Sequence, residues 1–153
     1  MKIRNIVICL IQKGNEIFVA QGRDEVKNET FYRPLGGGIE FGELAEVAAI
    51  REFKEEMNTD IEVLSYIHTF ENIFTFNGNR GHQIVILLEA KFKDTSIYEL
   101  DETTFVEDDD TVHVAKWVNK NMFISGDKIL YPEGLAEYLK AVSYTHLTLP
   151  TKA

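Results

Sequence analysis

The chain has one cysteine, three prolines, a deficit of positive charge and no apolar run long enough to span a bilayer. A single cysteine excludes an internal disulfide framework, and we expect Cys9 to be a buried strand residue in a reducing compartment. The N-terminal residues Met1 to Arg4 lead into a strand pattern and not into a signal sequence. These absences predict a cytoplasmic protein without a membrane partner.

Acidic residues outnumber basic ones by 25 to 16, which gives a formal net charge of -9. A nucleic acid polymer is therefore not an expected partner, because its binding surfaces are usually basic. A small nucleotide chelated by a metal ion remains compatible with this charge. The hydrophobic content of 44% is sufficient for one domain with its own core, which we place at residues 1–141.

Carboxylates gather at the end of a predicted helix. Glu52, Glu55 and Glu56 are spaced i, i+3 and i+4, so they share one helix face. Arg51 supplies one cation and leaves the patch negative, and oxygen-only ligands suit Mg²⁺ or Mn²⁺. The alternative is a solvated acidic helix face without a ligand.

The remaining pattern alternates strands and helices and predicts an α/β (α+β) fold. We expect a hairpin of Ile3–Ile11 with Glu16–Gln21. Further strands, which look antiparallel, are expected at Glu62–Phe76, Gln83–Phe92 and Val112–Val118. A helix is expected at Glu43–Met57, with Ala49, Ile50, Phe53 and Met57 buried. A last helix is expected to start near Tyr131, with Pro132 at its first position and Leu135, Tyr138 and Leu139 facing inward.

The segment from Gly37 to Asn58 resembles the Nudix box of the Nudix hydrolase family. It carries the box residues Gly37, Glu43, Arg51, Glu52, Glu55 and Glu56. Asn58 stands where the family usually has glycine, and Thr59 where an aliphatic residue is usual. Asparagine tolerates the left-handed conformation of a helix C-terminus, so we expect a conservative change. The resemblance implies an α/β/α sandwich with a curved mixed β-sheet between helices.

The resemblance also implies an activity, the hydrolysis of a nucleoside diphosphate linked to another moiety by water attacking phosphorus. Nucleoside triphosphates, oxidised nucleotides and dinucleoside polyphosphates are all open as substrates of this pyrophosphatase. Glu52, Glu55 and Glu56, with the backbone carbonyl of Gly36, would bind Mg²⁺ or Mn²⁺. Arg51 and Glu43 would orient that cluster, and a homodimer is open as an assembly.

Two sets of side chains beyond the box are candidates. Glu107, in the acidic run before the strand at Val112, is our candidate general base; the alternative is a solvated acidic loop. Phosphate or base contacts are expected from six residues: Arg23, Arg33, Tyr32, Phe74, Arg80 and His82.

Two rival readings concern function. A catalytically inactive, nucleotide-sensing Nudix-fold binding module would have lost the glutamates that are present here. An isoprenoid diphosphate isomerase of the same fold would need a catalytic cysteine, and Cys9 lies in the first strand.

Residues 142–153 break the amphipathic pattern before them and resemble the conceptual translation of a sequencing adaptor. We expect this tail to be non-native and assign it no function.

Overall fold

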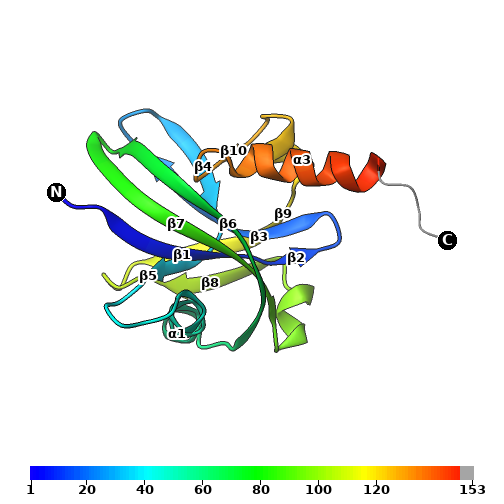
Figure 1. Cartoon of the computed structure of the whole chain (residues 1–153), viewed down its shortest axis with the longest axis horizontal. Helices are drawn as coiled ribbons and strands as arrows, with labels where there is room; N and C mark the ends of the chain where they lie inside the picture. Colours follow the sequence, from blue (N-terminus) through cyan, green and yellow to red (C-terminus); the bar gives the residue numbers. More distant parts are fainter. Residues whose placement is uncertain (149–153) are drawn as a thin grey trace.

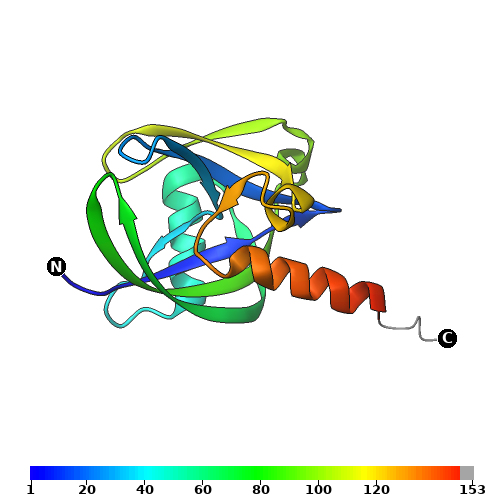
Figure 2. The ribbon, with the colours of Figure 1, turned by 90° about the horizontal axis from the view of Figure 1, so that it is seen from above.

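In a computed structural model, the backbone is described for residues 1–148 and the side chains for residues 1–142. Two sheets curve around a shared interior, with one long helix below them and another above (Figures 1 and 2). Within the described residues, no helix combines the length and apolarity needed to cross a membrane.

The first sheet has the order β5-β1-β7-β6. It consists of β5 (Gly36–Gly38), β1 (Arg4–Leu10), β7 (Asn79–Phe92) and β6 (Ile61–Phe76). Strand β1 lies inside this sheet, antiparallel to β5 on one edge and parallel to β7 on the other. The sheet is therefore mixed, as the resemblance implies, and β6 and β7 pair antiparallel as expected.

The second sheet has the order β10-β4-β3-β9-β8, and β2 pairs with β3 beside that path. It consists of β10 (Ile129–Leu130), β4 (Glu29–Arg33), β3 (Glu16–Asp24), β9 (Val112–Asn119), β8 (Glu102–Val106) and β2 (Gln12–Lys13). Four helical segments complete residues 1–148, namely α1 (Ala45–Met57), the 3₁₀ helix η1 (Thr95–Glu99), α2 (Asn121–Ile124) and α3 (Leu135–Thr148).

Strand β1 supplies both halves of the core because its side chains alternate between two faces. Val7 and Cys9 pack in the cluster that contains Phe53 of α1. Ile8 and Leu10 pack in the cluster that contains Leu135 and Leu139 of α3. A strand that is apolar on both faces fits a sheet covered on both sides. Cys9 is buried as expected, and burial raises the pKa of its thiol to about 12.

The expected N-terminal hairpin is partly wrong. The turn around Gly14 does form a hairpin, but only the short β2 pairs with the start of β3. The longer β1 instead joins the other sheet, where its apolar residues gain cover on both faces. The chain therefore crosses from one sheet to the other between Leu10 and Gln12.

Helix α1 begins two residues later than predicted, at Ala45. Glu43 closes the preceding loop instead, where its N–H donates to the Glu40 carbonyl (3.0 Å) and its carboxylate accepts from the Glu40 N–H (3.0 Å). The buried face is formed by Ala48, Ala49, Glu52 and Phe53. The prediction that Ile50 is buried is wrong, because it lies off this face.

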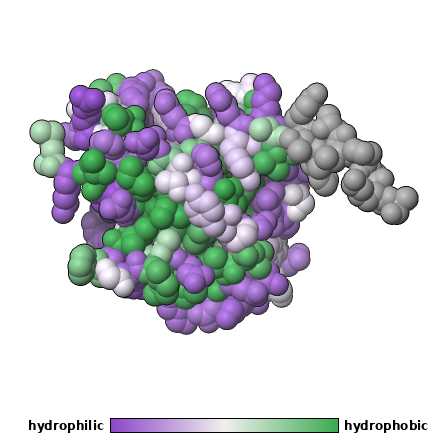
Figure 3. Space-filling view, in the orientation of Figure 1, coloured by the Kyte–Doolittle hydropathy of each residue, from purple (hydrophilic) through white to green (hydrophobic). Residues whose placement is uncertain are grey.

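Ile50 is one of several exposed apolar residues on or just before α1, which also include Leu44 and Val47. Figure 3 shows apolar side chains over the lower part of the molecule, where α1 lies.

Helix α3 also differs from its prediction. It starts at Leu135, and Tyr131 and Pro132 belong to the turn before it. Leu135 and Leu139 are fully buried as expected, and Tyr138 is half-buried. The helix continues to Thr148, past the point at Ala141 where the apolar pattern ends. Of the tail expected to be non-native, residues 149–153 lie outside the described structure.

The C-terminus of α1 has the predicted left-handed cap. Asn58 has φ 51° and ψ 41°, and its N–H donates to the Lys54 carbonyl (3.0 Å). Thr59, which replaces the usual aliphatic residue, is buried, and Ile61 supplies an apolar side chain two residues later.

This cap predicts a specific pair of stability effects. Asn58→Gly should leave the free energy of unfolding almost unchanged, since glycine accepts a positive φ. Asn58→Ala should lower it by about 1 kcal/mol, because a Cβ without a local polar partner is strained there. Urea unfolding of both variants tests this, and equal stability of the two would contradict it.

Candidate metal and catalytic site

The candidate site forms where three segments meet, namely strand β5 with its following loop, helix α1 and the turn between β8 and β9. Helix α1 packs against both β5 and β8, which brings the turn at residues 107–111 to the carboxylates of the helix. Segments far apart in sequence thus converge at one end of the molecule (Figure 1).

Arg51 lies at the centre of the site. Its guanidinium donates two hydrogen bonds to Glu43 (2.7 and 2.9 Å) and one to the carbonyl of Gly38 (2.9 Å). Its remaining terminal nitrogen donates to Glu52 (2.9 Å) and Glu55 (3.3 Å). The contact with Glu43 is bidentate, which is the strongest arrangement of this ion pair. The Arg51 cation holds the pKa of the Glu43 carboxyl down at about 2.

Glu52 is the buried member of the acidic cluster, with 6% of its surface exposed. Its side chain lies directly against the backbone of Gly37, where an added Cβ would overlap the Glu52 carboxyl group. A glycine is therefore required at position 37 by the approach of this carboxylate. Gly36 is needed for a different contact, because its Cβ would overlap the Val7 carbonyl of β1.

Three carboxylates converge closely enough to share a cation. Oxygens of Glu52, Glu55 and Asp108 lie within 4.8 Å of one another. Hard divalent ions prefer such oxygen ligands. Glu52 and Glu55 were predicted as ligands, whereas Asp108 was not singled out within its acidic run. Glu107, Asp109 and Asp110 beside it are also acidic, so the sequence does not distinguish Asp108 from them. Only the geometry of the turn does so.

Glu56, the third predicted ligand, lies beside this trio and is half-buried. Burial, followed by the negative charges of Glu107 and Glu52, raises its pKa to about 8. The crowding of like charges is what a bound cation would relieve. Glu56 therefore belongs to the same electrostatic site, although it is not one of the three converging ligands.

Glu107 is held by a predicted phosphate-binding residue. Arg33 of β4 donates a 2.6 Å hydrogen bond to the Glu107 carboxylate. The turn after Glu107 is closed by two backbone hydrogen bonds, from Glu107 N–H to Thr111 (3.0 Å) and from Asp110 N–H to Glu107 (3.0 Å). His113 lies 3.9 Å from the same carboxylate. The structure thus brings Arg33 and Glu107 together next to Glu56.

Two other predicted basic residues lie toward the tips of hairpins. Arg23 is paired in register with Thr30 and hydrogen-bonds to Thr30 and Asn28 of its own hairpin. Arg80 is exposed beside the β6–β7 turn. Asp24 joins the two tips, since its buried carboxylate accepts from the Asn77 N–H (3.2 Å). Neither arginine joins the acidic cluster in this structure.

The three remaining predicted contacts differ in exposure. Tyr32 is buried in the core cluster under α3, so its ring offers little free surface. Phe74 is half-buried and its ring covers Gly81 of the neighbouring strand. His82 is half-buried opposite Ile73.

Comparison with known proteins identifies similar chains. A family model described as "NUDIX domain" matches residues 1–140. The fold resembles the E. coli ORF135 protein, with a TM-score of 0.59, 20% identity and coverage of 99% of this chain and 96% of that one. It also resembles a MutT NUDIX hydrolase from Burkholderia pseudomallei, with a TM-score of 0.60, 20% identity and coverage of 90% and 95%. A NUDIX hydrolase from Nitrosomonas europaea has a TM-score of 0.61, 12% identity and coverage of 99% and 98%.

The hydrogen bonds of Arg51 lead to a prediction about metal affinity. Arg51→Lys removes the bidentate contact with Glu43, so the carboxylates lose their fixed orientation. Affinity for Mn²⁺ in isothermal titration should fall by about 10–100-fold, and Glu43→Gln should have a similar effect. Arg80→Lys, at an exposed turn, is the matched control. Unchanged affinity in Arg51→Lys would refute the orienting role.

The raised pKa of Glu56 predicts how metal-free protein responds to pH. The folded state binds more protons than the unfolded state between the ordinary value of 4.5 and about 8. The free energy of unfolding should therefore fall as pH rises through this window. Thermal unfolding in EDTA should show a smaller fall for Glu56→Gln than for wild type. Glu46→Gln on the same helix is the control, and parallel profiles for wild type and Glu56→Gln would contradict the prediction.

Proposed function

The chain belongs to the Nudix family, and we propose that it is a metal-dependent hydrolase that cleaves a pyrophosphate linkage in a nucleoside diphosphate joined to another moiety. The observation that carries this proposal is the convergence of Glu52, Glu55 and Asp108 within 4.8 Å, oriented from one side by Arg51. Clustered carboxylates of this kind suit Mg²⁺ or Mn²⁺ and the phosphate groups that such ions bind.

The residues divide the work between holding cations and positioning them. Glu52, Glu55 and Asp108 would hold the ions, with Glu56 and the carbonyl of Gly36 as further oxygen ligands at the same site. When bound, such ions neutralise charge on phosphoryl oxygens and lower the pKa of water. Arg51 anchors the loop through Glu43 and Gly38, and its remaining nitrogen contacts the proposed ligands Glu52 and Glu55 and keeps them in place.

Glu107 is the residue we propose as general base toward the attacking water. Its carboxylate lies beside Glu56 and accepts a hydrogen bond from Arg33 (2.6 Å), which holds it at the acidic cluster, where it could accept a proton from water. If substrate phosphate displaces this contact, Arg33 becomes available to bind it. Phosphate binding to Arg33 would then free the Glu107 carboxylate to act as the general base.

The substrate is proposed as a nucleoside triphosphate, an oxidised nucleotide or a dinucleoside polyphosphate. Among the predicted phosphate contacts, Arg33 is the one that the structure connects to the acidic cluster, through its hydrogen bond to Glu107. Arg80 and His82 on β7, Arg23 on β3 and Phe74 on β6 remain proposed contacts for the rest of the substrate, whereas the burial of Tyr32 in the core argues against a contact there.

Hydrolysis of a nucleotide panel with Mg²⁺ or Mn²⁺ tests the proposal. Release of phosphate and pyrophosphate should be metal-dependent, and Glu55→Gln should lower kcat by about 100-fold or more. Loss of a direct metal ligand should lower activity more than loss of a residue that only orients a ligand, which lowers metal affinity or activity by about 10–100-fold. Glu55 is exposed, so the variant should fold normally. Glu46→Gln, on the same helix, should retain full activity.

The outcomes separate the hydrolase from other functions. Nucleotide binding without turnover, in folded wild-type protein with either metal, would favour a sensing module and refute the proposal. If hydrolysis is found, Glu107→Gln should lower kcat while metal affinity stays unchanged. Loss of metal affinity in that variant would instead make Glu107 a ligand.

A further inference from the structure

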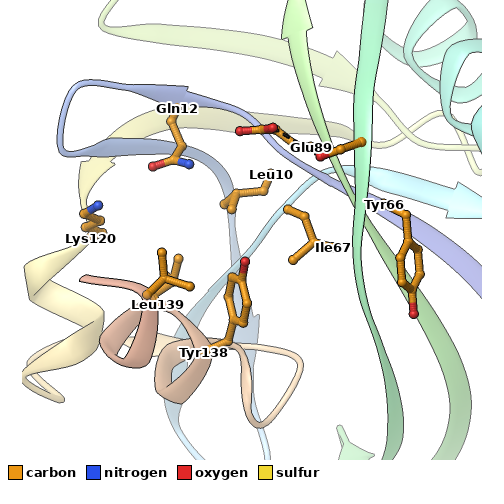
Figure 4. Close-up of a pocket in the computed structure, with 10 residues that line it drawn as sticks. Leu10, Gln12, Tyr66, Ile67, Glu89, Lys120, Tyr138 and Leu139 are labelled. Carbon is orange, nitrogen blue, oxygen red and sulfur yellow. Dashed lines mark hydrogen bonds between the residues drawn. The ribbon is translucent and has the colours of Figure 1, made fainter. Parts of the chain in front are cut away.

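A second cavity lies on the α3 side of the first sheet, away from α1 and its carboxylates. Its volume is about 290 Å³. The apolar lining is formed by Leu10 of β1, Ile67 of β6 and Leu139 of α3 (Figure 4), together with Val142, the first residue of the tail that we expect to be non-native. The sheet separates this cavity from the acidic site, because Leu10 faces α3 whereas Val7 and Cys9 face α1.

Polar side chains from five different elements line the same cavity. Glu89 of β7 and Lys120 at the start of α2 supply opposite charges, and Gln12 and Tyr138 lie between them (Figure 4). Ser65 donates a 3.2 Å hydrogen bond to Glu89. Burial and the Glu89 charge raise the pKa of Tyr138, which places this side chain near Glu89.

The backbone of β6 is irregular at this cavity. The pairing of β6 with β7 shifts register between Val63 and Ser65, and again between Tyr66 and His68. Such bulges redirect side chains and are frequent beside binding sites. Here they flank Ser65, Tyr66 and Ile67, all of which line the cavity.

The charges of Glu89 and Lys120 indicate which chemical groups a ligand of this cavity would carry. Glu89 and Lys120 are both half-buried, yet neither forms an ion pair with any residue of the described part of the chain. Partly desolvated charges are costly unless they are compensated. A ligand that carries both an ammonium and a carboxylate group would compensate both at once.

We propose that this cavity binds a small zwitterion, an α-amino acid with an apolar side chain. Its ammonium group would contact Glu89, its carboxylate would contact Lys120, and its side chain would cover Leu10, Ile67 and Leu139. The volume is at the lower limit of about 300 Å³ for small-molecule pockets, which favours a ligand of this size over a nucleotide. The inference is independent of the hydrolase activity.

Isothermal titration with leucine, methionine and phenylalanine tests the proposal. At least one should bind saturably at millimolar concentration. For leucine, the matched probes are isopentylamine, which lacks the carboxylate, and 4-methylpentanoate, which lacks the amine. Each should bind about tenfold more weakly or worse, since each loses one charged contact. Equal binding of either probe, or no binding of any amino acid, would overturn the proposal.

Variants locate the binding. Glu89→Gln and Lys120→Met should each weaken amino acid binding by about tenfold. The controls Glu62→Gln and Lys91→Met break an exposed ion pair between β6 and β7, outside the cavity lining, and should bind normally. Gln12→Trp at the exposed rim should block the cavity even if a charge variant fails to fold. Wild-type affinity in folded Lys120→Met or Gln12→Trp would refute the site.

Glu55→Gln protein should bind the amino acid with unchanged affinity, which separates this test from that of the hydrolase.

Discussion

The Arg51 guanidinium is the interaction on which the acidic site depends. Four partners surround it, and it links the loop at Gly38 and Glu43 to the helix at Glu52 and Glu55. Without this cation, several carboxylates would repel one another at short range before any metal arrives. The site is therefore partly neutralised in advance, and enough negative charge remains to attract a divalent ion.

Features that depend on neighbouring residues were predictable from the sequence. Helix periodicity placed Glu52, Glu55 and Glu56 on one face, and the tolerance of asparagine for positive φ identified the cap at Asn58. The family and fold followed from the same segment. Even here the helix start was misjudged, because the contacts of Glu43 with Glu40 and Arg51 are not helical.

Features that depend on distant partners were not predictable. The parallel pairing of β1 with β7 joins segments some eighty residues apart. Strand propensity does not predict which strands pair. The acidic run offered four candidates, and the closure of its turn decides that Asp108 meets the helix while Glu107 meets Arg33. For the same reason, sequence alone did not reveal that Tyr32 is buried while Arg33, one residue later on the same strand, reaches the site.

Strand β1 has a further consequence because it is hydrogen-bonded along both edges. Its amides should be among the last in the molecule to exchange with solvent, since each one opens only when the neighbouring strand that accepts its hydrogen bond separates from β1. The glycine backbone of β5 is anchored directly to this strand. The backbone beneath the acidic cluster thus belongs to the slowest-opening part of the fold, and partial unfolding elsewhere can leave it intact.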